Sequence, residues 1–274
     1  MQPLRRLPLP MSNPLLYVAA GLFVGTMVGL TGVGGGSLMT PILVLLFGQS
    51  PLMAVGTDLM FSATTKLAAT ASFGYSRRVD WRIVGRLASG SLPGAAGVIL
   101  WFFWMRRAPN VENRIIPECL GVMLGLTSIG LLLQNLLQQL GLKVIGGWLE
   151  RAERLKLPLT IVTGLLLGIG VTLTSVGAGA LGVVALLALY PLRLTADRLV
   201  ATDIAHALPV TLVAALGHAS LGHLNLQVLA CLLLGSVPGV VIASRIVIRI
   251  PATVTRPLIA IVLAFVSWRM LKTV

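Results

Sequence analysis

The sequence predicts an all-helical, polytopic membrane protein made of two homologous, inverted repeats. Three observations lead to this class: a high apolar content, apolar segments of bilayer length, and short motifs that recur in the same order. Of the 274 residues 56% are hydrophobic and 11% are charged, whereas roughly a quarter of the residues of an ordinary soluble domain are charged. Lipid must therefore cover most of the surface.

Apolar segments follow one another along the whole chain, and most are long enough to cross a bilayer. A hydrocarbon core of about 30 Å needs about 20 helical residues. Segments 37–48 and 180–190 are too short, and we expect them to be half-helices or re-entrant pieces. The segments are 15–31, 37–48, 54–73, 84–104, 119–140, 158–174, 180–190, 199–217, 226–248 and 254–271.

Three motifs of the first half return in the second half. The aligned pairs are Val28–Leu38 with Val171–Leu181, Val55–Asp58 with Val200–Asp203, and Gly90–Gly94 with Gly235–Gly239. We therefore predict a first repeat at 1–140, an amphipathic linker at 141–157 and a second repeat at 158–274. An odd number of segments per half inverts the second repeat, whereas broken helices giving four crossings per half would make the repeats parallel.

The formal net charge is +13, but Lys and Arg fall between apolar runs and form no single patch. This pattern is typical of loops beside anionic lipid headgroups and argues against nucleic acid. The loop charges predict that both termini lie outside and that the protein is a multi-pass component of the bacterial inner (plasma) membrane. Cys119 and Cys231 have no metal-binding spacing, so we expect no metal and no cofactor.

The glycine-rich segment at 32–36 is the strongest candidate for a binding site. Its glycines let the backbone leave helical geometry, and a half-helix beginning near Gly36 would direct its positive end toward an anion. The aligned segment 175–179 would supply a second such end, although close helix packing through small residues is the competing explanation. The candidate residues here are Thr31, Gly32, Gly34, Gly35, Gly36, Ser37, Ser175, Gly177 and Gly179.

With these motifs the chain resembles the TauE/SafE family of sulfite, sulfonate and related anion transporters. The likeness rests on Gly29–Pro41, Ala54–Thr57, Val79–Arg82 and Gly90–Gly94, together with the weaker second copy. The resemblance implies a secondary transporter, not an enzyme, that carries small organic or inorganic anions. Sulfur-containing anions such as sulfite, thiosulfate and sulfoacetate are the expected substrates.

One departure from that family concerns two carboxylates. The position after Thr57 is usually small and polar in such proteins, but here it is Asp58, and Asp203 follows Thr202 in the second half. A carboxylate in a membrane segment is expensive, so we expect both to couple transport to H⁺ or Na⁺, with the threonines helping to form a polar site. An ion pair between Asp58 and Lys66 is the alternative.

Two further residue types, lysine and histidine, leave alternatives open. Lys66 could provide a positive charge for the anion or extend to the surface, and His206 could line a cavity or be a packed histidine. His218 and His223 favour a rival class, a membrane-embedded metal enzyme, but they lack HExxH spacing. A scaffold without transport is the third alternative, although a scaffold does not need duplicated glycine-rich breaks.

Overall fold

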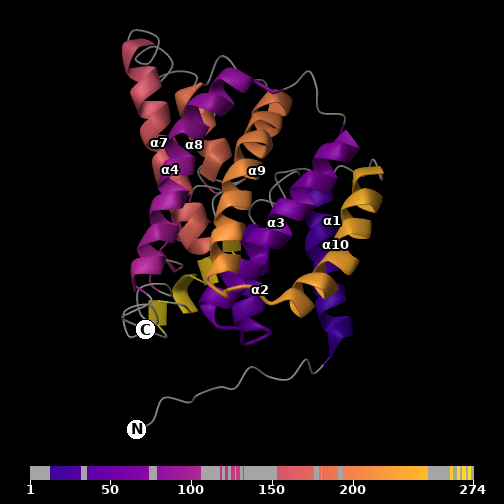
Figure 1. Cartoon of the computed structure of the whole chain (residues 1–274). Coiled ribbons are helices and arrows are strands. Elements are labelled where there is room, and N and C mark those ends of the chain that lie inside the picture. Colours follow the sequence, from indigo (N-terminus) through magenta and orange to yellow (C-terminus); the bar gives the residue numbers. More distant parts are fainter. Residues whose placement is uncertain are drawn as a thin grey trace.

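A computed structural model describes most of the chain outside the linker and the termini. The described residues are 13–31, 36–73, 79–105, 153–175, 179, 181–190, 194 and 196–245, with single positions between 118 and 132 and between 260 and 272. Within these ranges the regular elements are all α-helices (Figure 1). They are α1 (Pro14–Thr31), α2 (Gly36–Leu45), α3 (Pro51–Phe73), α4 (Trp81–Met105), α7 (Glu153–Thr174), α8 (Leu181–Leu189), α9 (Ala196–Ser220) and α10 (Leu226–Arg245).

Length and surface confirm the prediction of a polytopic membrane protein. Four described helices are long and apolar enough to cross a bilayer, and they are Trp81–Met105, Leu155–Thr174, Arg198–Ser220 and Leu226–Ala243. Large apolar side chains such as Leu15, Trp104 and Leu234 are exposed on the outside of the bundle. Water would solvate such a surface poorly, so lipid is its natural solvent.

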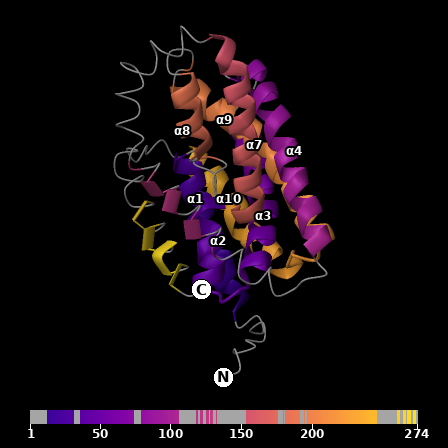
Figure 2. The ribbon, with the colours of Figure 1, turned by 90° about the vertical axis from the view of Figure 1, so that its left-hand side faces the viewer.

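The two short helices, α2 and α8, each form a hairpin with the helix before them. Tyr17, near the start of α1, stacks on Phe47, just beyond the end of α2, with ring centroids 4.0 Å apart. Likewise, Thr160 near the start of α7 shares a 2.7 Å hydrogen bond with Tyr190, which follows α8. The outer ends of the two helices in each hairpin therefore lie together. Figures 1 and 2 place α2 toward the lower end of the bundle and α8 toward the upper end.

The closest helix contacts join one half of the chain to the other. A Cβ atom added at Gly21 or Gly25 of α1 would overlap the backbone of α10, and one at Gly235 or Gly239 of α10 would overlap or press on the backbone of α1. We call this contact the first glycine seam. Small residues let membrane helices approach until their backbones touch, and this contact replaces the hydrophobic drive that lipid cannot provide.

The second glycine seam joins α4 to α7 through the aligned positions. Gly90 and Gly94 of α4 lie against the α7 backbone, and Gly164 and Gly168 of α7 lie against the α4 backbone. The Gly90–Gly94 and Gly235–Gly239 motifs therefore have the same packing role in both halves.

Described positions of the segments near 118–132 and 260–272 are also helical. The two segments are in contact, because the Ser128 hydroxyl donates a 2.8 Å hydrogen bond to the Ala260 carbonyl.

Helices α3 and α9 occupy the middle of the bundle. They contact each other, and each also contacts the seam on its other side: α3 packs on α10, and α9 packs on α4 (Figure 1). Of the predicted linker at 141–157, residues 141–152 lie outside the described residues, and α7 already begins at Glu153. The charged end of that segment thus belongs to the first helix of the second half.

Candidate functional site

The charged residues predicted from the sequence lie in the centre of the bundle. Asp58 and Lys66 come from α3, and Asp203 and His206 come from α9. All four side chains are buried, with exposures between 0% and 4%. Ionised groups in a membrane interior are costly, so each of these residues needs a partner or a function.

Asp58 is held by hydroxyl groups and by the backbone of a half-helix. Its Oδ2 accepts a 3.0 Å hydrogen bond from the Thr40 backbone N–H and a 2.5 Å bond from the Thr40 hydroxyl, near the N-terminal end of α2. The Ser62 hydroxyl lies 3.5 Å from Oδ1. The Ser175 hydroxyl also acts on this carboxylate, without a hydrogen bond of standard geometry. Asp58 therefore occupies a polar cage that receives groups from both halves.

Asp203 has a different environment, although it is aligned with Asp58. Its Oδ1 atom is buried and has no hydrogen-bond partner. The same oxygen occupies the place that a Cβ atom would take at Gly182, in the first turn of α8. Asp203 thus rests against its half-helix, as Asp58 rests against α2, but without the hydroxyl cage.

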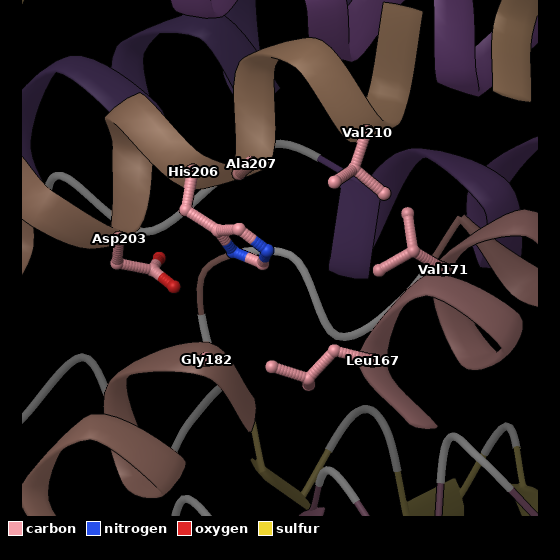
Figure 3. Close-up of a pocket in the computed structure, with 7 residues that line it drawn as sticks. All are labelled: Leu167, Val171, Gly182, Asp203, His206, Ala207 and Val210. Atoms are coloured by element: carbon pink, nitrogen blue, oxygen red, sulfur yellow. The ribbon is translucent and has the colours of Figure 1, made fainter. Parts of the chain in front are cut away.

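A small cavity lies between Asp203 and His206 (Figure 3), and the free space is about that of one water molecule. Both side chains project into it from α9, with α7 and α8 opposite. His206 Nε2 is 2.9 Å from the hydroxyl of Ser91, which belongs to α4. The lining residues are Leu167, Val171, Gly182, Asp203, His206, Ala207 and Val210.

Lys66 connects the two carboxylates electrostatically. Its ammonium group interacts with both Asp203 and Asp58, and the interaction with Asp203 is the larger. The side chain is 3% exposed, so it does not extend to the surface as the alternative prediction allowed. Lys66 interacts with Asp58, as the alternative expectation has it, and also with Asp203 on the facing helix. The centre thus contains one ammonium group shared by two carboxylates.

The hydroxyl groups of Thr57 and Thr202 connect the two halves. Thr57 accepts a 3.1 Å hydrogen bond from the backbone N–H of Asn225, and Thr202 accepts an equal bond from the backbone N–H of Asp80. Asn225 and Asp80 are the N-caps of α10 and α4, because their side-chain oxygens accept hydrogen bonds from first-turn N–H groups. Each threonine of the Thr-Asp pairs therefore supports the start of a helix from the other half.

The glycine-rich breaks are described only in part. Thr31 ends α1, and Gly36 and Ser37 begin α2, while Gly32, Gly34, Gly35 and Gly177 lie outside the described residues. In the second break, Ser175 has a φ of 57° and Gly179 has a φ of 125°. A serine rarely adopts this left-handed backbone, and such strain is concentrated at functional sites.

Sequence reasoning left out three hydroxyl residues of the centre, Thr40, Ser62 and Ser91. Thr40 and Ser91 belong to motifs that the sequence singled out, the first in Gly29–Pro41 and the second in Gly90–Gly94. The motifs therefore contained the signal, but only the fold shows that these hydroxyl groups reach Asp58 and His206. Ser62 could have been found from its position one helical turn after Asp58.

His218 and His223 form a separate cluster beyond the central charges. His218 Nε2 lies 2.9 Å from the Thr172 carbonyl, and its Nδ1 lies 3.4 Å from Nδ1 of His223. Phe102 packs edge-on against both rings, so this aromatic residue belongs to the core. In the described part of the chain no three His, Cys, Asp or Glu residues are grouped as a metal site would require.

Comparison with known proteins agrees with this architecture. A family model described as "Sulfite exporter TauE/SafE" matches residues 17–270. A Bacillus subtilis (strain 168) protein, "Probable membrane transporter protein YjnA", is 38% identical over 229 residues, which are 84% of this chain and 88% of the relative. The "Probable membrane transporter protein YunE" of the same organism is 35% identical over 74 residues, or 27% of each chain. No solved structure matches the chain.

The family match covers nearly the whole chain, including both glycine-rich segments and both Thr-Asp pairs. The apolar helices and the relative from Bacillus indicate a multi-pass protein of the bacterial plasma membrane. A membrane transporter is not an enzyme, which agrees with the class expected from the motifs. The chain belongs to the TauE/SafE (sulfite exporter) family of membrane transporters.

Proposed function

We propose that the protein is an ion-coupled secondary transporter of small oxyanions, above all sulfur-containing ones such as sulfite, thiosulfate and sulfonates. The observation that carries this proposal is the buried ammonium group of Lys66, which interacts with two buried carboxylates, one on its own helix and one on the facing helix. A buried ammonium group that is paired with carboxylates of the same protein can exchange a carboxylate for a substrate anion of similar shape. Coupling to H⁺ or Na⁺ is part of this proposal.

The half-helices support an anion site at the same place. The N-terminal end of a helix carries a partial positive charge and free N–H groups. Asp58 accepts hydrogen bonds near this end of α2, and Asp203 rests on the first turn of α8. A carboxylate therefore lies where we propose that the substrate binds. One of these carboxylates acts as a resident anion that a sulfonate or sulfite replaces beside Lys66.

The backbone of the two breaks completes the proposed site. We assign substrate contacts to Thr31 through Ser37 and to Ser175, Gly177 and Gly179, because non-helical backbone at membrane depth is tolerated beside protein or a watery cavity. His206 borders the site through its cavity. Thr57 and Thr202 contribute by holding the helices that carry it, since their hydroxyl groups already accept backbone hydrogen bonds.

We also propose that the two halves are inverted repeats that exchange positions during transport. In support, the aligned first helices α1 and α7 begin at opposite ends of the bundle in Figure 1, and the two hairpins lie toward opposite ends. Inverted repeats with interrupted helices commonly place the substrate near the bilayer midplane, where rocking of one repeat exposes it to either side. The contacts across the halves would then rearrange as one unit.

Purified protein in proteoliposomes tests the proposal. Imposed gradients of sulfite, thiosulfate, sulfoacetate, taurine and a dicarboxylate are compared for flux, with empty liposomes as background. We expect flux of at least one sulfur oxyanion, and a loss of about tenfold or more in Lys66→Met, because the anion loses its ammonium partner. Lys156→Met, at the start of α7 and away from the centre, is the matched control.

A thermal-shift series on the same preparation checks binding independently. A ligand that binds only the folded protein raises its apparent stability. The transported anion should stabilise the wild type and not Lys66→Met. Equal flux in Lys66→Met and the wild type, or stabilisation by zinc with no effect of any anion, would reject this site and this function.

A further inference from the structure

The two aligned carboxylates lie in environments that suit different tasks. Both donors of Thr40 point at Oδ2 of Asp58, so a proton arriving at that oxygen would have to displace a hydrogen bond that is already made. Oδ1 of Asp203 is buried, and no hydrogen-bond donor among the described residues reaches it. An unpaired buried acceptor is costly, and a bound proton would remove that cost. The vacant acceptor position is therefore at Asp203.

We propose that Asp203 alone carries the coupling proton, that Lys66 passes between Asp203 and the substrate anion, and that Asp58 stays a fixed counter-charge. This inference rests on the proposed function and deepens it. Lys66 on the facing helix interacts electrostatically with Asp203 as well as with Asp58. When a proton converts the Asp203 carboxylate to a carboxylic acid, the ammonium group is released from its partner and binds the anion. Release of the anion and the proton on the other side restores the ion pair.

Charge balance in the centre supports proton and anion moving together. With both carboxylates ionised, one ammonium and two carboxylates leave a net negative charge, which repels a second anion. One proton on Asp203 makes the centre neutral before the anion enters. Proton and anion binding then strengthen one another, and the coupling free energy is reciprocal.

The residues around Asp203 favour a proton over Na⁺. Apart from Asp203 and His206, the cavity is lined by the apolar or side-chain-free residues of α7, α8 and α9. A hard cation needs several oxygen ligands, and these side chains provide only the carboxylate. A proton needs one acceptor and a water-sized space, and the cavity offers both (Figure 3).

Other charged or titratable groups near α9 could also contribute to the pH dependence of anion binding. The facing helix α3 contributes Lys66 and Asp58, and α9 itself contributes His206, which contacts Ser91 of α4. The first turns of α4 carry Asp80, Arg82 and Arg86, of which Arg82 is exposed. Helix α8 has no titratable residue between Leu181 and Leu189, and α7 faces the cavity with apolar side chains.

The decisive experiment measures sulfonate affinity as a function of pH. Methanesulfonate and sulfoacetate are suitable probes because their charge is constant across the neutral range, so that the slope reports the protein. One linked proton weakens wild-type binding by about tenfold per pH unit above the midpoint. Asp203→Asn should bind with no pH slope, whereas Asp58→Asn should keep the slope. Removing Na⁺ should change neither.

A second measurement needs no substrate. The infrared difference spectrum between low and high pH should contain the C=O band of a protonated carboxyl group, lost in Asp203→Asn and kept in Asp58→Asn. If Asp203→Asn fails to fold, Gly182→Ala replaces it: this change keeps every charge but forces the Asp203 carboxylate to move, so the pH midpoint should shift. Gly97→Ala on α4, where a Cβ meets open space, is its control.

The outcomes separate the two proposals. Failure of any anion to bind the wild type would reject the transport function, while the infrared band would still decide whether Asp203 takes up a proton. A pH slope that survives in Asp203→Asn, a band that disappears in Asp58→Asn, or an affinity that depends on Na⁺ would overturn the assignment to Asp203.

Discussion

The two glycine seams and the polar centre preserve the duplication to very different degrees. Both seams have glycine at the aligned positions, and in each case helices of opposite halves touch through their backbones. The N-cap bonds made by Thr57 and Thr202 are equally symmetric, with the same length of 3.1 Å. Around Asp58 and Asp203, by contrast, the side chains differ at nearly every aligned position.

The differences remove the cage from the second half. The alignment that pairs Leu38 with Leu181 also pairs Thr40 with Val183. The alignment that pairs Asp58 with Asp203 pairs the remaining residues of the centre. Four pairs differ, first half before second: Thr40 with Val183, Ser62 with Ala207, Lys66 with Thr211, and Phe61 with His206. The pair Ser91 and Ser236 is identical, but the two serines have different partners. Ser91 bonds to His206, whereas the Ser236 hydroxyl has no partner and the counterpart of His206 is a phenylalanine.

This comparison indicates which parts of a duplicated transporter are free to diverge. Where two helix backbones touch, only the hydrogen atom of a glycine side chain fits between them. Packing therefore requires glycine at the aligned positions of both halves. A site of charged residues, in contrast, tolerates substitutions as long as its net charge stays balanced. The asymmetric placement of a single lysine near two carboxylates then allows one carboxylate to exchange its charge while the other keeps it.

Breaking a glycine seam should have the largest effect. In Gly164→Leu, the new side chain overlaps the backbone of α4 at Leu87, which cannot move aside as a flexible side chain could. Overpacking of this kind costs about 3 kcal/mol or more. The midpoint of thermal unfolding in detergent should fall strongly, while Gly97→Leu, on an open face of α4, should change it little. A mild effect of Gly164→Leu would mean that the helices are not in backbone contact.

Removing the two threonine hydroxyls that accept hydrogen bonds from the other half should have an intermediate effect, and the effect should be equal in the two halves. Thr57→Val and Thr202→Val keep the side-chain shape but leave the N–H of Asn225 or Asp80 without its acceptor. Each should destabilise the protein by about 1 kcal/mol, measured by thermal unfolding. Thr64→Val is the matched control on α3, because its hydroxyl bonds only to its own helix. Clearly unequal losses would argue against the symmetric role of these bonds.

The smallest effect is expected for Ser175→Gly, at a position where the first half has Gly32. Ser175→Gly relieves the cost of a positive φ but also makes the unfolded chain more flexible, so stability should change by less than about 1 kcal/mol. Ser175→Val should instead destabilise by about 2 kcal/mol, because a β-branched residue is poorly accommodated at a φ of 57°. Thermal unfolding of the two variants distinguishes backbone strain from the loss of the hydroxyl, which both share.

Much of the architecture could be predicted from the sequence, because its cause is local. Apolar length identified the spans, and the short segments 37–48 and 180–190 correspond to the half-helices α2 and α8. The recurring Thr-Asp motif also identified Asp58 and Asp203 as candidate site residues, and Lys66 was a candidate because it is a lysine in an apolar segment. The structure brings these three together, as a membrane interior requires of charged groups.

The partners of these residues could not be predicted, because they depend on how distant helices meet. Nothing local distinguishes Asp58, with its Thr40 donors, from Asp203, which has none on Oδ1. The choice of Asp203 over Asp58 as the stronger partner of Lys66 arises from the packing of α3 against α9. Likewise, the threonines of the Thr-Asp pairs suggested a polar site, but their hydroxyl groups serve as anchors for helix starts.

The first glycine seam has a consequence for how the protein is made. Gly21 packs against Leu232 and Gly25 against Ser236, so α1 meets its main partner only when almost the entire chain has left the ribosome. The second seam can close much earlier, once Gly168 has been synthesised. Contacts so distant in sequence form slowly. During biosynthesis the face of α1 that carries Gly21 and Gly25 therefore cannot pack on its partner until α10 has been inserted.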